Sequence, residues 1–112
     1  MRIVISILAI LFALLHIIAS ITQFKSKDPA ARGSALMMAL GGMAVIAAAV
    51  THLLGVGETI IAQATVLELL VGCGMVWFAA WLNGKRSEDF HLPHHVIRGG
   101  IAALLVIGFA IW

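Results

Sequence analysis

Four polar side chains interrupt long apolar stretches of this sequence, and they are its best candidates for chemistry. Glu68 carries the strongest signal, because a charged side chain in the middle of a membrane-spanning helix costs about 2.5–3.5 kcal/mol on insertion. Such residues usually face a helix bundle or a wet cavity. Carboxylate and imidazole groups can each hold and pass a proton. The sequence therefore predicts a site for protons or a small cation, built from Glu68, His16, Gln63 and His52.

The helical neighbours of Glu68 predict which way its side chain points. Positions three, four, seven or eleven residues away share one side of a helix. These positions hold Ile61, Ala64, Thr65, Gly72, Met75 and Ala79. Most of these side chains are small or polar. We therefore expect Glu68 to face the other helices. Two structural alternatives stay open: Glu68 and His16 form a hydrogen-bonded pair that only fixes helix register, and His52 is an interfacial residue outside any relay.

The composition indicates the solvent around the chain. Of its 112 residues, 62% are apolar and 11% are charged, whereas soluble domains average about 45–50% and about 25%. This excess predicts a protein dissolved in a bilayer. The net charge of only +2 gives no reason to expect nucleic-acid binding, and the basic residues are better matched to anionic lipid headgroups.

The apolar runs predict an all-α integral membrane protein, a bundle of four transmembrane helices that forms a single domain over residues 1–112. We expect the spans at about 3–24, 34–54, 58–82 and 96–112. The first three reach the length of about 20 residues that a spanning helix needs, and the fourth is shorter. The charged connection that contains Pro29 is predicted to separate the first two spans.

The distribution of basic residues predicts the orientation. Six of the seven Lys and Arg residues lie in or beside the first and third connections, and Arg2 is the exception. Connections rich in Lys and Arg stay in the cytoplasm. Both the N-terminus and the C-terminus are therefore expected to be extracytoplasmic. We expect a multi-pass protein of a bacterial or archaeal plasma membrane.

Small residues recur at helical spacing and predict the packing faces. Lipid tails give helices no hydrophobic drive to associate, so close approach at small side chains matters more. The first span offers Ser6, Ala9, Ala13, His16, Ser20 and Gln23, the second Gly41, Ala44, Ala48, Thr51 and Gly55, and the fourth Gly99, Ala103 and Ala110. Gly41, Ala48 and Gly72 are the main packing candidates. These faces exceed what one bundle needs, so a homo-oligomer or a larger membrane subunit as partner is expected.

Three histidines in the third connection, His91, His94 and His95, form a weak candidate site for a divalent metal. Imidazoles at this density can bind zinc, nickel or copper, but their spacing matches no closed four-ligand pattern. A solvated connection is the simpler interpretation. We expect no other cofactor.

Three functions follow from these features. The first is a transporter or channel subunit for protons or a small cation, which uses the buried Glu and His side chains. The second is an accessory or structural membrane subunit that does not transport, and the third is a metal-binding membrane protein. No nucleophile–base–acid set, phosphate loop or nucleotide fingerprint is present, so an enzyme is not expected.

Overall fold

The chain folds into four long helices, as described by a computed structural model that covers residues 1–56, 59–86 and 90–112. They are α1 (Arg2–Phe24), α2 (Pro29–Leu54), α3 (Thr59–Arg86) and α4 (Leu92–Ile111). Each is long and apolar enough to cross a membrane. The longest dimension of the molecule, 44 Å, is close to the full thickness of a bilayer with its headgroups, about 40–45 Å.

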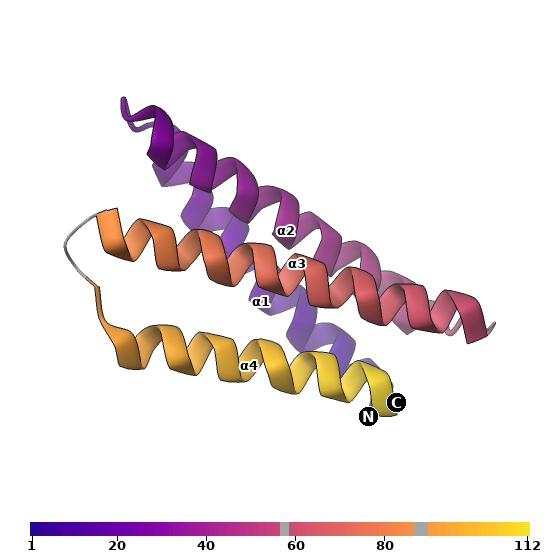
Figure 1. Ribbon diagram of the computed structural model, residues 1–112. Coiled ribbons are helices and arrows are strands. Elements are labelled where there is room, and N and C mark those ends of the chain that lie inside the picture. The colour runs from indigo at the N-terminus through magenta and orange to yellow at the C-terminus, as the bar shows by residue number, and fades with distance from the viewer. Residues whose placement is uncertain (57–58, 87–89) are drawn as a thin grey trace.

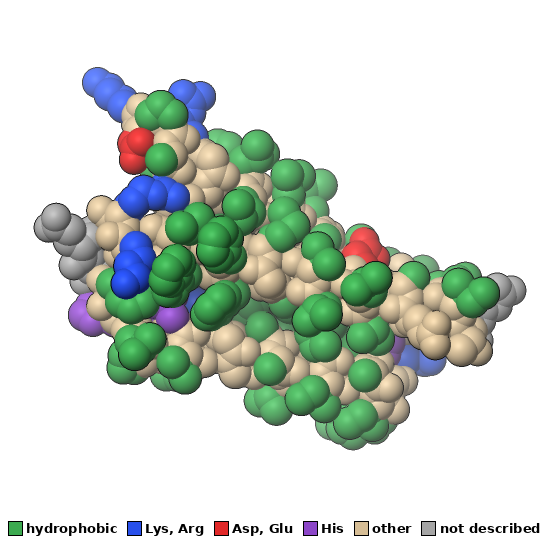
Figure 2. Space-filling view, in the orientation of Figure 1, with side chains coloured by type: hydrophobic (Ala, Val, Ile, Leu, Met, Phe, Trp, Pro, Cys, Tyr) green, Lys and Arg blue, Asp and Glu red, His purple; other side chains and the backbone are tan. Residues whose placement is uncertain are grey.

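The helices run back and forth along one another (Figure 1), so both chain ends lie at one end of the bundle. We call this the termini end. The opposite end, which holds the α1–α2 and α3–α4 connections, we call the basic end, because Lys and Arg side chains gather there (Figure 2). α3 packs mainly against α2, and α2 against α1, while α4 packs against α3 and α1.

Two helices begin earlier than the apolar runs indicate. Asp28 caps α2, because its carboxylate accepts a hydrogen bond from the backbone N–H of Ala30 at 3.0 Å, and Pro29 occupies the first turn. Pro is well suited to this place, where a backbone N–H has no helical partner. Pro93 does the same in α4, which starts at Leu92. His94 and His95 therefore lie in the first turn of a helix, not in a free loop.

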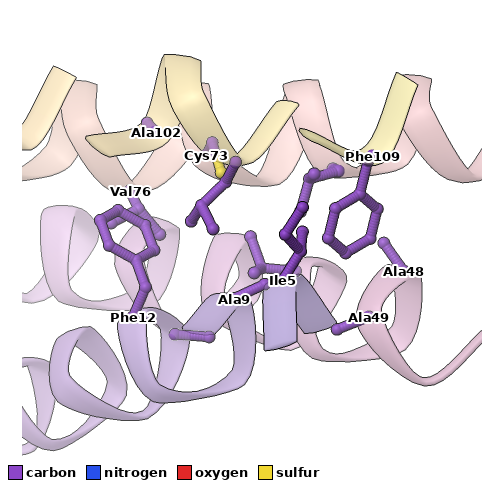
Figure 3. Packing of buried hydrophobic residues seen from close by; sticks show 13 residues of the cluster. Ile5, Ala9, Phe12, Ala48, Ala49, Cys73, Val76, Ala102 and Phe109 are labelled. Carbon is purple, nitrogen blue, oxygen red and sulfur yellow. The ribbon is translucent and has the colours of Figure 1, made fainter. Parts of the chain in front are cut away.

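All four helices contribute to the core, and many of its side chains are small. Ile5, Ala9 and Phe12 of α1 meet Leu105 and Phe109 of α4 in a layer that α2 and α3 complete. Figure 3 shows the aromatic rings of Phe12 and Phe109 pointing into the space between the helices. This packed apolar layer separates the two ends of the bundle.

Glycines set the spacing between α2 and α3, as predicted for Gly41 and Gly72. A Cβ atom on Gly72 would lie 2.8 Å from the backbone oxygen of Gly41 and 2.9 Å from Cγ2 of Val45. Both glycines are buried, and Ala48 is fully buried. The two backbones therefore touch within one chain, so these glycines by themselves give no support to an oligomer.

The predicted packing faces hold for α1 but not for α4. Ser6, Ala9, Ala13, His16 and Ser20 are all buried. In α4, Ala103 and Ala110 are exposed, and the helix instead buries its larger side chains Leu105 and Phe109 together with Ala102, Gly108 and His95. The prediction was wrong here because α4 meets its neighbours through bulky groups, including a stack of Phe109 on His52 with ring centres 4.1 Å apart.

Apolar side chains are spread over the face between the two ends that Figure 2 shows, and many large apolar side chains of the described residues are exposed. Large side chains such as Leu15, Ile60 and Leu104 are more than two thirds exposed. Soluble monomers rarely expose so continuous an apolar surface. The same side chains suit lipid tails, which need no polar partner.

Candidate functional site

The polar residues of the helices collect around two cavities at opposite ends of the bundle. The basic-end cavity has a volume of about 740 Å³, and its polar lining includes His16, Gln23, Asn83, Arg86, His91, His94, His95 and Arg98. The termini-end cavity has a volume of about 550 Å³, and its polar lining includes Arg2, Thr51, His52, Thr59, Gln63 and Thr65. The apolar core layer lies between them.

His16 lies on the inner wall of the basic-end cavity. It is eight residues from the last residue of α1, which corresponds to a depth of about 12 Å along the helix. Its Nδ1 lies 2.7 Å from the backbone oxygen of Phe12. A carbonyl oxygen can only accept a hydrogen bond, so Nδ1 carries the hydrogen. The neutral ring then presents Nε2 as a proton acceptor.

His52 lines the termini-end cavity from the last turn of α2. Its Nδ1 lies 3.1 Å from the hydroxyl oxygen of Ser6, which joins α2 to α1. Nε2 is buried and makes no hydrogen bond of normal geometry within the described residues, although the Trp112 backbone is close enough to interact electrostatically. Its ring is half-buried and stacks on Phe109, so His52 takes part in the packing of α2 against α4.

Glu68 does not face the other helices, and that prediction was wrong. Its side chain is exposed on α3, and it lines neither cavity. Taking 100° per residue, Glu68 lies about 80° from the centre of the buried sector of α3. Thr65, Gly72 and Ala79 are buried as expected, but Glu68 falls just outside the sector that they share.

The predicted pair of Glu68 and His16 is therefore not formed. The structure separates the four sequence candidates into three places. His16 lines the basic-end cavity, His52 and the exposed Gln63 line the termini-end cavity, and Glu68 lies on the outer surface of α3.

A polar network at the basic end was not predicted from the sequence. Asn83 donates to the Gln23 side-chain oxygen at 2.6 Å, and Arg86 donates to Asn83 at 3.4 Å and to the buried Ser34. These bonds join α1, α2 and α3. The signal in the sequence was the Asn-Gly-Lys-Arg run directly after an apolar span, which continues α3 instead of leaving it.

α4 is attached at the same end through a tryptophan. Trp77 donates from Nε1 to the backbone oxygen of His95 at 3.0 Å. His95 in turn stacks on Phe90 with ring centres 4.7 Å apart, and Lys85 lies 4.5 Å from the Phe90 ring centre. Trp77 thus orients the first turn of α4.

The loop histidines give no formed metal site. Within residues 1–56, 59–86 and 90–112, no group of three or more His, Cys, Asp or Glu side chains is arranged to hold a metal ion. The rings of His94 and His95 lie edge to face with centres 6.2 Å apart. Metal binding by His91, His94 and His95 stays a prediction from sequence alone.

These features define a class: an all-helical chain with four helices of membrane-spanning length, carrying a polar cavity at each end. Comparison with family models, with curated proteins and with solved structures finds no match for this chain. Its function has to be inferred from its own residues.

Proposed function

We propose that the four helices span a bacterial or archaeal plasma membrane with the basic end in the cytoplasm and both termini outside. The support is the charge asymmetry. Six of the seven Lys and Arg residues belong to the basic end: Lys25, Lys27, Arg32, Lys85, Arg86 and Arg98. Cytoplasmic connections carry such an excess.

Labelling of a single cysteine tests this orientation. In a chain whose buried Cys73 is replaced by serine, Lys27→Cys should resist a membrane-impermeant thiol reagent in intact cells and react after permeabilisation. A cysteine added directly after Trp112 serves as the control and should react in intact cells. Efficient labelling at position 27 in intact cells would reverse the orientation.

We further propose that the protein is a small transporter or channel subunit that conducts protons. The observation that carries this proposal is the pair of polar cavities at opposite ends, each with a histidine in its lining. Imidazole can take up and release a proton near neutral pH. Asp28 is the one carboxylate residue in either lining among the described residues, so a metal cation would find few of the oxygen ligands that it needs, whereas a proton needs only the imidazoles.

The path between the cavities is closed by packed side chains. His16 and Ser6, the partner of His52, are ten residues apart on α1, or about 15 Å. Ala9, Phe12 and Ala13 lie between them and are buried. Conduction would therefore require the layer around Phe12 and Phe109 to rearrange or admit water, and under this proposal the packed layer is a closed gate.

Proton flux into liposomes tests the transport function. With a pH-sensitive dye enclosed, wild-type protein should collapse an imposed pH gradient, and His16→Ala should slow this at least about ten-fold because the acceptor at the cavity wall is lost. His94→Ala is the matched control, since His94 lines the same cavity but is exposed. Wild-type flux no greater than that of empty liposomes would remove the proposal.

A second function is favoured by a different observation. Glu68 is exposed at the outer surface of α3, between the exposed Leu67 and Leu70. A carboxylate in contact with lipid tails is costly. We therefore also propose that a second copy or a larger membrane subunit covers this face, in which case the chain is an accessory or structural subunit.

A further inference from the structure

The basic-end cavity holds positive charge that the described residues do not balance. Arg98 is half-buried in its lining, and it is close enough to both His16 and His95 to interact electrostatically. Within the described part of the chain, no carboxylate forms a salt bridge with Arg98. A cavity of one sign inside low-dielectric walls focuses its field on a charge of the opposite sign.

Asp28 is the one acidic residue that lines this cavity among the residues described, and it is already engaged. It is exposed, and one oxygen accepts the hydrogen bond that caps α2. Glu88 and Asp89 lie outside the described residues. Asp28 therefore leaves the inner part of the cavity, around Arg98, without a negative partner.

His95 brings a second polar group into the same lining. It is only 5% exposed, and its Nδ1 is buried with no hydrogen-bond partner among the described residues. Leaving such a group unpaired is unfavourable. The ring is held in place from both sides, by Phe90 and by Gly84, where a Cβ atom would lie 2.7 Å from Nε2. It therefore cannot easily turn away to find water.

The first turn of α4 adds a third contribution. His91 is its N-cap residue. The dipole of a helix favours negative charge near its N-terminal end. His95 lies in this turn and Arg98 one turn further along the same helix, so the dipole of α4 adds to the positive charge of Arg98 in the cavity.

We propose that the basic-end cavity binds a phosphate-type oxyanion beside Arg98 and His95. Arginine recognises phosphate through paired N–H donors, and the imidazole of His95 in the same lining adds a positive charge beside the anion when it is protonated. The ligand is inorganic phosphate or the headgroup phosphate of an acidic lipid. The cavity of about 740 Å³ has room for either. This site does not depend on whether the chain conducts protons.

Nuclear magnetic resonance of the five histidine rings tests the site directly. The full chain, with ¹⁵N-labelled imidazoles, is titrated in detergent with inorganic phosphate at constant pH, against chloride at matched ionic strength. Phosphate should shift the His95 and His16 signals with saturation. His52 lies in the opposite cavity and is an internal control that should stay unchanged.

A lipid arm separates the two sources of the same chemistry. The protein is placed in nanodiscs of phosphatidylcholine alone or with phosphatidylglycerol added. A saturable shift of His95 with phosphatidylglycerol assigns the site to lipid headgroups, and a shift with inorganic phosphate only assigns it to a soluble anion. If neither probe shifts His95 and His16, or if His52 shifts equally, the site is overturned.

Matched variants tie the signal to Arg98. Arg98→Gln should weaken phosphate binding at least about ten-fold, because a charge-assisted donor pair is lost, and Arg98→Lys should retain part of it. Arg32→Gln removes the same charge at an exposed position that lines neither cavity and should change binding less than two-fold. Equal weakening by Arg98→Gln and Arg32→Gln would contradict a specific site. The wild-type titration decides the question even if a variant does not fold.

Discussion

Gly72→Ala should destabilise the bundle by about 1–3 kcal/mol, the range for forcing an extra carbon into a packed interior. In an ordinary helix the same change is favourable, because glycine is about 1 kcal/mol worse than alanine. At Gly72, however, the new Cβ atom would lie 2.8 Å from the Gly41 oxygen and 3.1 Å from the Val45 backbone nitrogen. Both are backbone atoms, so α2 and α3 must move apart.

Gly74→Ala is the matched control on the same helix. Gly74 is exposed, and a Cβ atom there has no heavy atom within 4 Å. This variant should be neutral or more stable by up to about 1 kcal/mol. Denaturant-induced unfolding of the two variants in the same detergent measures the difference. Equal effects at positions 72 and 74 would show that the α2–α3 contact does not control stability.

Glu68→Leu should weaken self-association about ten-fold while making the single chain easier to insert. Replacing the carboxyl removes an insertion cost of about 2.5–3.5 kcal/mol. If a second copy covers this face, the change also removes an interhelical hydrogen bond of about 1–2 kcal/mol. One substitution should therefore make insertion of the single chain easier and association of two chains weaker, so a general loss of folding cannot explain both results.

Stepwise photobleaching of labelled protein in large vesicles, over a range of protein-to-lipid ratios, measures the association. Glu68→Gln keeps the hydrogen-bonding capacity and should associate like the wild type. Leu70→Ala alters an exposed residue on another side of α3 and serves as the control. Unchanged or tighter association of Glu68→Leu would mean that no second copy covers Glu68.

Hydropathy and helical spacing predicted the parts of the fold that depend on local pattern. The four helices follow from the four apolar runs, since each run is too long for a typical strand and long enough for a helix. The buried face of α1 follows from the spacing of Ser6, Ala9, Ala13 and His16. The close contact at Gly41 and Gly72 follows from the need for small residues where backbones meet.

Glu68 shows where that reasoning ends. The neighbouring small residues correctly located the packed side of α3, but spacing does not fix the centre of a contact to better than one residue, or about 100° of rotation. Glu68 lies at the edge of the buried sector of α3, where an error of this size decides whether the side chain is buried or exposed. The prediction of the buried face of α4 was wrong for a related reason. Phe109 fills the space between the helices, so α4 does not need small residues on its packed side.

The basic-end cavity could not be predicted because its residues come from all four helices. Arg98 and His95 are close in sequence, but His16 is far from both. Only the packing of α1 beside α4 brings it to the same wall. Pro29 and Pro93 were interpreted as parts of connections, whereas each lies in the first turn of a helix and lengthens it into the polar region.

The two chain ends lie together at one end of the bundle (Figure 1), which bears on how such a chain can be copied. If this gene were duplicated and fused in frame, a short linker could join the last residue of the first copy to the first residue of the second without crossing the bilayer. The product would carry parallel repeats, related by an axis along the membrane normal. It could not carry inverted repeats unless a further spanning helix were inserted.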